Sequence, residues 1–356
     1  MREKWVDAVK ASSVLCVLLG HAGAGIPLIS GFSVLFYVPV FFVLAGYLHH
    51  HRPEESYGTY LGRRAKRLLV PYFGCSLFLL LFSVFKEIAA GSFVAQKALR
   101  SLCGILLAVN TIVPSGSVSI TGEPLLDVWN SPLWFLPALF LTELLFEGML
   151  CLFRGRQRRM LWAGVWCLVL GIAAHYMLPV LLPWSLKTVP VLEVFLMAGW
   201  QIKRKGSLKR IAEKPLWILA VTAFAGMLRI WNGPVNLSIG FWGGSLVCGV
   251  LACLSASVVL MAVCFRFRDS IPEGLSLIGQ NTMPVFCLHM FLFMFLQAGI
   301  GLFVPEFPDG GTWQCGLGKI AMVLITVDIL VIGGIGAGQI KGRYRTKRAG
   351  EKGKEE

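Results

Sequence analysis

The chain has 356 residues, of which 56% are hydrophobic and only 15% are charged. Soluble domains average about 45–50% apolar and about 25% charged residues, so this composition excludes an ordinary soluble protein. The formal net charge is +14, and in a membrane protein such an excess gathers in cytoplasmic loops without indicating nucleic acid. The sequence therefore predicts an all-α, polytopic membrane bundle whose surroundings are a lipid bilayer.

Apolar runs near the ~20 residues that a helix needs to cross a bilayer recur along the chain. They predict ten spans: 8–26, 31–48, 69–90, 132–152, 160–178, 188–202, 215–231, 243–265, 282–304 and 317–340. The segment 98–113 is short for a span. We interpret it as a re-entrant or interfacial helix inside a long outer loop, 91–131. The first span has no small-residue cleavage site, so no cleaved signal peptide is expected.

The basic residues test this count of spans. With a cytoplasmic N-terminus, 26 of the 33 Lys and Arg residues fall in cytoplasmic segments. The positive-inside rule then favours cytoplasmic N- and C-termini. Residues 1–340 are expected to form one membrane domain. The basic, polar segment 341–356 is expected to be a disordered cytoplasmic tail.

The first span carries ionisable residues on one stripe. Lys10 and His21 are eleven residues apart, which places both on one helix face with a rise of roughly 16 Å between them. Asp7 precedes Lys10 by three residues and can pair with it. A membrane helix must turn such a stripe away from lipid, so the stripe marks a functional site.

The next segments contain a pair of arginines and a proline that is expected to interrupt a helix. Pro39 is expected to interrupt the hydrogen bonds of the second span. Arg64 and Arg67 are neighbours on a helix that is expected to end near Pro71. Two guanidinium groups at the cytoplasmic side suit phosphate recognition, although the spacing alone favours ordinary positive-inside charge that reaches lipid headgroups.

Histidines and cysteines suggest metal binding only weakly. His49, His50 and His51 are consecutive but lack carboxylate or cysteine partners in the sequence, so we expect a surface run. The ten cysteines are scattered without CxxC or zinc spacing, and most lie in apolar runs, where cysteine behaves as a small hydrophobe. The sequence therefore predicts no metal site.

Further polar residues lie inside later spans. Trp134 stands at the predicted outer interface, where tryptophan is commonly an anchor. Glu143 lies about mid-span and needs a partner, for which Lys10, Arg229 or a histidine are candidates; Glu193 raises the same question. Asn281 resembles a helix N-cap, and His289 follows two turns later.

Five segments in order resemble the acyltransferase family 3 membrane proteins, most closely the fucose 4-O-acetylase-related branch. The opening segment supplies Arg2, Asp7, Lys10 and His21. The others are YVPVFFVLAGYL, RRAKRLLVPY, SPLWFLPALF and IGQNTMPVFCLH. The chain departs from the family at Tyr37, where His is common, at Ala45, where Ser is common, and at Lys187, where an acidic residue is frequent.

The resemblance implies transfer of an acyl group, usually acetyl from acetyl-CoA, to a hydroxyl of an extracytoplasmic or lipid-linked glycan in a bacterial-type plasma membrane. It makes His21 the catalytic residue and Lys10 the basic signature residue, with Arg64 and Arg67 on the CoA phosphates. Asn281 and His289 are candidate oxyanion donors, and Trp134 and Glu143 are candidate substrate or structural groups. A glycolipid or solute transporter, or a membrane sensing module, is the alternative. The acceptor and the oligomeric state stay open.

Overall fold

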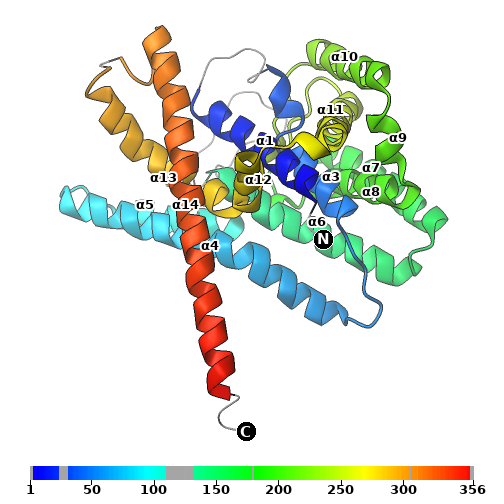
Figure 1. The fold of residues 1–356 in the computed structure, drawn as a ribbon, viewed down its shortest axis with the longest axis horizontal. Helices are drawn as coiled ribbons and strands as arrows, with labels where there is room; N and C mark the ends of the chain where they lie inside the picture. Colours follow the sequence, from blue (N-terminus) through cyan, green and yellow to red (C-terminus); the bar gives the residue numbers. More distant parts are fainter. Residues whose placement is uncertain are drawn as a thin grey trace. The chain divides into compact units, whose positions relative to one another are not determined.

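The computed structural model describes residues 3–23, 31–109, 125, 131–178, 180–304, 306–310 and 312–352. These residues are overwhelmingly helical, and within them the only extended pairing is an isolated bridge between Asn236 and Phe241 (Figure 1). In this described part of the chain, seven helices are long and apolar enough to cross a membrane. The predicted all-α, multi-pass membrane fold is therefore confirmed.

Each predicted span overlaps at least one helix, although several helices begin or end elsewhere than predicted. In chain order they are α1 (Lys4–His21), η1 (Ser33–Leu35), α3 (Pro39–Tyr47), α4 (Tyr57–Ala89), α5 (Ala95–Leu107), η2 (Ser131–Trp134), α6 (Phe135–Phe153), α7 (Gln157–Met177), η3 (Pro183–Ser185), α8 (Val189–Lys205), α9 (Ser207–Ala212), α10 (Pro215–Asn232), η4 (Leu237–Ile239), α11 (Leu246–Arg266), η5 (Arg268–Ser270), α12 (Glu273–Gln280), α13 (Thr282–Gly301) and α14 (Trp313–Lys352).

The seven candidate spans are α4, α6 with part of η2, α7, α10, α11, α13 and the first part of α14. The other three predicted spans correspond to α1, to η1 with α3, and to α8. α1 carries three charged residues in its first two turns, and α3 and α8 are short. The count of ten spans and the cytoplasmic location of both termini stay predictions.

Two prolines behave differently from each other. α3 begins at Pro39, after a turn, as the sequence predicts. The expectation that a helix ends near Pro71 is wrong, because α4 is 33 residues long and Pro71 lies inside it. Membrane helices tolerate an internal proline when neighbouring groups satisfy the freed backbone. At about 50 Å, α4 exceeds the ~30 Å hydrocarbon core, so its arginine-bearing first turns extend beyond it.

The helix α5, of 13 residues, begins just before the short segment 98–113 and covers its first ten residues. A helix of this length is about 20 Å long and does not cross a bilayer. Tyr72 donates a hydrogen bond to the carbonyl of Ile105, and Trp184 donates one to the carbonyl of Leu106. Residues 110–113 lie outside the described part of the chain.

Contacts divide the chain into two compact units. The terminal unit comprises residues 1–25 and 271–356, and the central unit comprises residues 26–270. In the terminal unit, α1 packs along α12 and also against α13, which packs on α14. A Cβ at Gly279 of α12 would overlap the backbone of Asp7 in α1. The absence of a side chain there lets the two helices pack backbone to backbone.

The central unit is built around an equally close pair, α3 and α8. A Cβ at Gly46 would overlap the backbone of Leu196, and a Cβ at Gly199 would overlap the carbonyl of Val43. Small residues on both helices bring their backbones together, as is typical of helix pairs in membranes. The remaining helices of this unit pack around that pair, including α7 and α6 against α8, α11 against α3, and α4 against α6.

Replacing Gly199 with alanine is expected to destabilise the central unit by about 1–3 kcal/mol, the usual cost of overpacking a tight core. Gly74→Ala is the matched control, because Gly74 also lies inside a helix but a Cβ there would meet nothing within 4 Å. Thermal unfolding in detergent, followed by circular dichroism, should show a lower midpoint for Gly199→Ala alone. Equal midpoints would contradict the close packing of α3 on α8.

The last helix, α14, continues into the basic segment after residue 340, to Lys352. The basic, polar composition of this segment is the reason why the sequence predicts a disordered tail. The division into a membrane domain, 1–340, and a tail, 341–356, stays a prediction.

Candidate functional site

His21 and His289 contact each other directly in the terminal unit. Nδ1 of His21 lies 2.9 Å from Nε2 of His289, and the two rings are nearly parallel. The two residues are 268 positions apart, at the end of α1 and in the middle of α13. We call this pair the histidine dyad.

Hydrogen bonds at the far side of the dyad assign its protons. Nδ1 of His289 lies 2.9 Å from the carbonyl oxygen of Phe286 and 3.2 Å from that of Val285. A carbonyl oxygen only accepts, so this nitrogen carries the proton, and Nε2 of a neutral His289 is an acceptor. His21 then donates from Nδ1, which leaves its Nε2 with a free lone pair.

The two rings differ in exposure. His289 is 1% exposed and packs edge-on against Phe293. His21 is exposed, and its Nε2 has no hydrogen bond to any residue that the structure describes. A buried, fixed histidine thus orients an accessible one, with the basic nitrogen of His21 directed away from its partner. This is the arrangement that a general base requires.

Of the predicted stripe on α1, Asp7 is buried against protein and Lys10 partly so, whereas His21 touches His289 and is otherwise exposed. Asp7 is 2% exposed and lies against α12, where Ser276 donates a 3.5 Å hydrogen bond to its carboxylate. Lys10 is half-buried on the same helix. Asp7 lies fourteen residues before His21, a rise of about 21 Å, so it does not orient the dyad. Its pairing with Lys10 stays a prediction, and Arg2 lies outside the described residues.

Asn281 lies apart from the dyad. It stands at the N-cap position of α13, but its side chain makes no capping hydrogen bond and instead donates to the carbonyl of Leu277. It precedes His289 by eight residues, a rise of about 12 Å. His289 also has its ring proton bonded to carbonyls. The geometry therefore favours His289 as a positioning residue for His21 over an oxyanion donor.

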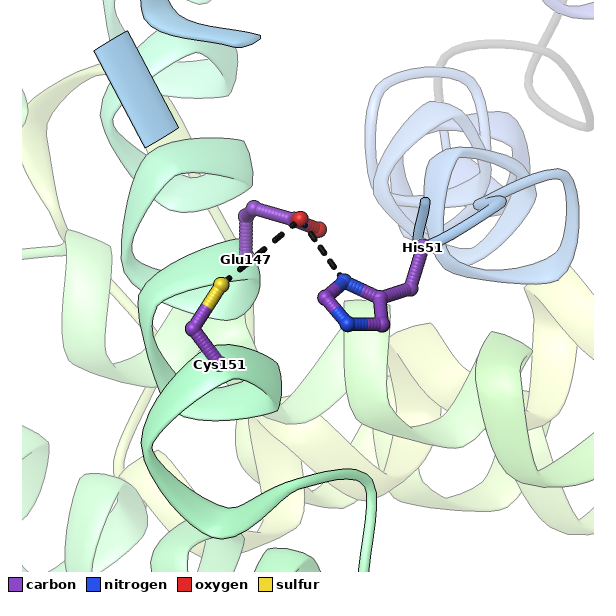
Figure 2. A group of neighbouring side chains, drawn as sticks. All are labelled: His51, Glu147 and Cys151. Atoms are coloured by element: carbon purple, nitrogen blue, oxygen red, sulfur yellow. Dashed lines mark hydrogen bonds and ion pairs between the residues drawn. The ribbon is translucent and has the colours of Figure 1, made fainter. Parts of the chain in front are cut away.

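The three consecutive histidines differ from the expected surface run. His49 is 8% exposed, and its Nε2 lies 2.7 Å from Oε2 of Glu147. Nδ1 of His51 lies 2.8 Å from Oε1 of the same carboxylate, and Cys151 is one turn further along α6 (Figure 2). The expectation failed because the carboxylate and the cysteine come from α6, nearly a hundred residues later, and the local sequence does not reveal so distant a partner. Only His50 is fully exposed and without such a partner.

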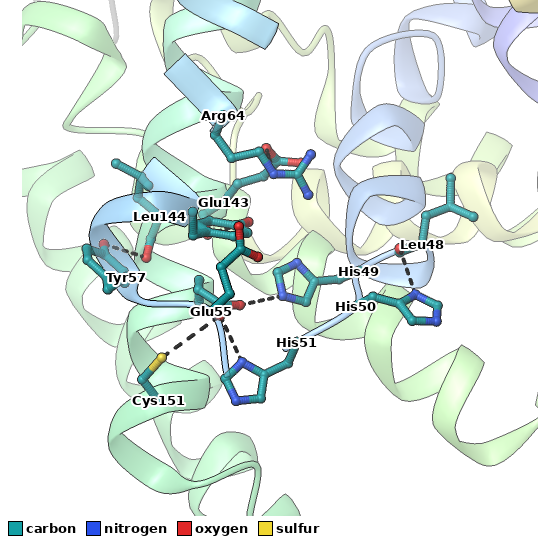
Figure 3. Close-up of polar contacts among 12 residues, drawn as sticks. Leu48, His49, His50, His51, Glu55, Tyr57, Arg64, Glu143, Leu144 and Cys151 are labelled. Carbon is teal, nitrogen blue, oxygen red and sulfur yellow. Dashed lines mark hydrogen bonds and ion pairs between the residues drawn. The ribbon is translucent and has the colours of Figure 1, made fainter. Parts of the chain in front are cut away.

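Glu143, one turn before Glu147, pairs with Arg64. The Nε–Oε2 distance is 3.2 Å (Figure 3). The guanidinium of Arg64 also lies over the ring of Tyr60. Arg64 is not among the partners that the sequence predicts for Glu143, so that prediction of the partner is wrong. The two groups form an ion pair without an aligned hydrogen bond. Glu193, fully buried in α8, has no hydrogen-bond partner among the described residues.

Arg67 and Trp134 complete the predicted site residues, both in the central unit. Arg67 is exposed, and it makes no hydrogen bond or ion pair within the described chain. The i, i+3 spacing thus produces one tethered arginine and one free one. Trp134 is 8% exposed, in contrast to an interfacial anchor, and borders a small pocket that Ser185, Lys187 and Ser238 also line.

Sequence reasoning missed Glu147 and Cys151. They follow Glu143 by four and eight residues along α6, a spacing that puts three ionisable side chains on one helix face. That ladder, together with the histidine run, was the available signal. For the contact between His21 and His289 no local signal existed, because hydropathy shows that a residue faces protein without showing which residue it faces.

The described fold is that of a multi-pass membrane protein with an accessible, oriented histidine. A family model described as an acyltransferase domain matches residues 3–333, nearly the whole chain. The protein is therefore a membrane acyltransferase, and it belongs to acyltransferase family 3, as the five sequence segments predict. The narrower likeness to the fucose 4-O-acetylase-related branch stays a prediction. No curated protein and no solved structure matches the chain.

Proposed function

We propose that the protein moves an acetyl group from cytoplasmic acetyl-CoA, or another acyl group from its CoA thioester, to a hydroxyl of an extracytoplasmic or lipid-linked glycan. Membership of the acyltransferase family supports the reaction class. The observation that carries the proposal is the histidine dyad, whose hydrogen bonds leave a basic nitrogen accessible on His21. The positive-inside distribution supports a plasma-membrane protein with both termini in the cytoplasm.

In the proposed reaction, Nε2 of His21 takes the proton from the acceptor hydroxyl as the hydroxyl oxygen attacks the thioester carbonyl. The new C–O bond forms, the C–S bond breaks, and the CoA thiolate leaves and takes the proton from His21. While His21 carries the extra proton, its Nδ1–H remains bonded to Nε2 of His289, which favours the charged ring. A general base contributes about 10²–10⁴-fold, so substrate positioning and oxyanion stabilisation must supply the rest.

The two arginines of α4 are proposed to bind the phosphates of the donor. Arg67 is exposed and free of ion pairs among the described residues. Arg64 is held by Glu143 through an ion pair whose geometry is poor. A phosphate offers a bidentate partner that can replace such a carboxylate. Lys10 and Asp7 are proposed to act on the same reaction from α1, as the basic signature residue and its partner.

Replacing Arg67 with alanine is expected to raise the KM for acyl-CoA about tenfold or more with little change in kcat, because a hydrogen bond to a charged group is worth about 1.5–3 kcal/mol. Arg63→Ala is the matched control on the same helix: Arg63 is exposed but already donates two hydrogen bonds to Glu55. Arg64→Ala is less informative, because it leaves buried Glu143 unpaired. Donor titrations in reconstituted vesicles measure these values, and an equal KM for Arg63→Ala and Arg67→Ala would argue against donor binding by Arg67.

The proposed activity is tested by deleting the chain in its native cell and comparing the acetylation of surface glycans by mass spectrometry. Loss of acetyl groups, restored by the wild-type chain, supports the proposal. Unchanged acetylation together with altered export of a glycolipid or solute would support the transporter alternative. Unchanged acetylation with a defect in signalling would support the sensing module.

A further inference from the structure

Four chemically active side chains converge at the end of α6 and on the connection between α3 and α4. Glu147 and Cys151 are separated by one turn of α6 and lie on the same face as Glu143. His49 and His51 come from the connection, residues 48–56 (Figure 3). Both side chains bond to the carboxylate of Glu147. None of these four residues has a part in the proposed acyl transfer.

Three of these side chains offer metal ligands at suitable separations. Nδ1 of His51, a carboxylate oxygen of Glu147 and Sγ of Cys151 all lie within 4.8 Å of one another (Figure 2). The nitrogen–oxygen distance is 2.8 Å and the sulfur–oxygen distance is 3.9 Å. In a tetrahedral zinc site the corresponding separations are about 3.4 and 3.6 Å. Small side-chain rotations therefore bring the three atoms to zinc-binding distances.

The surroundings hold this set in place. His49 binds the second oxygen of Glu147, and its ring packs edge-on against Phe146. These two contacts hold the ring of His49, so that it fixes the carboxylate, while its buried Nδ1 has no hydrogen-bond partner among the described residues. Orienting partners of this kind are common behind metal ligands. Cys151 is exposed and His51 is partly exposed, which gives an ion a route to the site.

The connection is also fixed at its other end. Arg63 of α4 donates two hydrogen bonds to the carboxylate of Glu55, at 3.0 and 2.6 Å. The hydrogen bond from Arg63 lowers the pKa of Glu55 below its usual value, so this carboxylate stays ionised at neutral pH. The backbone that carries His49 and His51 therefore runs between two anchored points, Glu147 on α6 and Arg63 on α4.

We propose that His51, Glu147 and Cys151 bind one Zn²⁺ ion, with water as the fourth ligand, and that the ion clamps the connection 48–56 to α6. A set of imidazole, carboxylate and thiolate suits zinc, whereas magnesium and calcium prefer oxygen ligands alone. Binding releases the thiol proton of Cys151 and moves the proton of neutral His51 from Nδ1 to Nε2. In the predicted topology the site faces the cytoplasm, where thiols stay reduced. The proposal replaces the sequence-based expectation of no metal and is independent of the acyl-transfer reaction.

The test uses the full chain, purified in detergent through a tag that contains no histidine. Equilibration against buffered zinc, followed by elemental analysis, should give about one zinc ion per chain. Cobalt(II) in place of zinc should produce a sulfur-to-cobalt charge-transfer band in the near ultraviolet. That band is absent if no thiolate binds the metal, so its absence in the wild-type chain would overturn the proposal without any variant.

Variants then identify the ligands. Cys151→Ser should abolish the cobalt charge-transfer band, and His51→Gln and Glu147→Gln should weaken zinc binding by more than about 100-fold. His49→Leu, which removes the orienting hydrogen bond to Glu147, should weaken it by about 10- to 100-fold. The matched controls are His50→Gln and Cys248→Ser, because His50 is exposed in the same histidine run and Cys248 lies apart from the cluster on α11.

Both control variants should bind zinc like the wild type. If His50→Gln and His51→Gln lost zinc affinity equally, the binding would be nonspecific attraction to a run of histidines, and the proposal would be overturned. Gel filtration of the metal-free variants shows whether each remains folded. A melting temperature that rises with zinc in the wild type and in His50→Gln, but not in Cys151→Ser, supports the clamp.

Discussion

Replacing His21 with alanine is expected to lower acyl transfer by about 10²–10⁴-fold, the usual contribution of a general base, while the protein stays folded in the membrane. The reason is local: Nε2 of His21 is the accessible nitrogen of the dyad and, with Nδ1 bonded to His289, is free to take a proton. His21 lies at the C-terminal end of α1 and is exposed. Its truncation therefore removes little packing.

The measurement is the acetylation of surface glycans in a deletion strain that carries either chain, with equal membrane abundance shown by immunoblot. His50→Ala is the matched control, because it removes an exposed histidine outside the dyad. His21→Asn adds a second test. It retains a group that can donate to His289 but supplies no base, so it should be as inactive as His21→Ala. Wild-type acetylation in either His21 variant would reject His21 as the base.

The positions of the helices could be predicted from the sequence because the bilayer leaves the backbone few choices. A run of apolar residues between charged segments must satisfy its own hydrogen bonds, and a helix does so. α6, α7, α10 and α11 consequently begin and end within a few residues of the predicted spans. Pro71 was misjudged for the opposite reason. Its local effect is to end a helix, but the surrounding helices in a membrane protein accommodate it.

The pairing of polar residues could be predicted only in part. The stripe on α1 had to face protein, and Asp7 and His21 do face α12 and α13. Which side chain meets each of them depends on how helices pack, and their spacing along one helix does not contain that information. Glu143 shows the same limit: its need for a partner followed from its mid-span position, whereas the choice of Arg64 followed from the packing of α4 on α6.

The histidine run shows how a local argument can fail when the missing partner is distant. The carboxylate that meets His49 and His51 is that of Glu147, nearly a hundred residues later, and it bonds to both rings. A buried carboxylate needs such partners, and a buried histidine needs an acceptor. The contact between Glu147 and the two histidines satisfies both requirements. Looking for an acidic residue in one span and a histidine in another is therefore more informative than looking for metal ligands that are close in sequence.

The dyad makes a second large prediction, at His289. If His289 orients His21, a replacement that keeps a hydrogen-bond acceptor near Nε2 should keep much of the activity, and a replacement of similar size without an acceptor should not. His289→Gln is the first kind, because its amide oxygen can accept from Nδ1 of His21. His289→Leu is the second. We expect a loss in kcat of about 10- to 100-fold for His289→Leu, by analogy with the loss on removing groups that orient metal-bound histidines, and a smaller loss for His289→Gln.

A role in packing alone would give a different pattern. His289 is buried against Phe293, so both variants should lower the melting temperature to a similar extent. Stability therefore serves as the control, and kcat as the discriminating readout. Combining His289→Leu with His21→Ala should cause no further loss beyond His21→Ala, because His289 acts through His21 and the two effects are not additive. Equal kcat in the Gln and Leu variants, or an additive loss in the double variant, would show that His289 does not act by orienting His21.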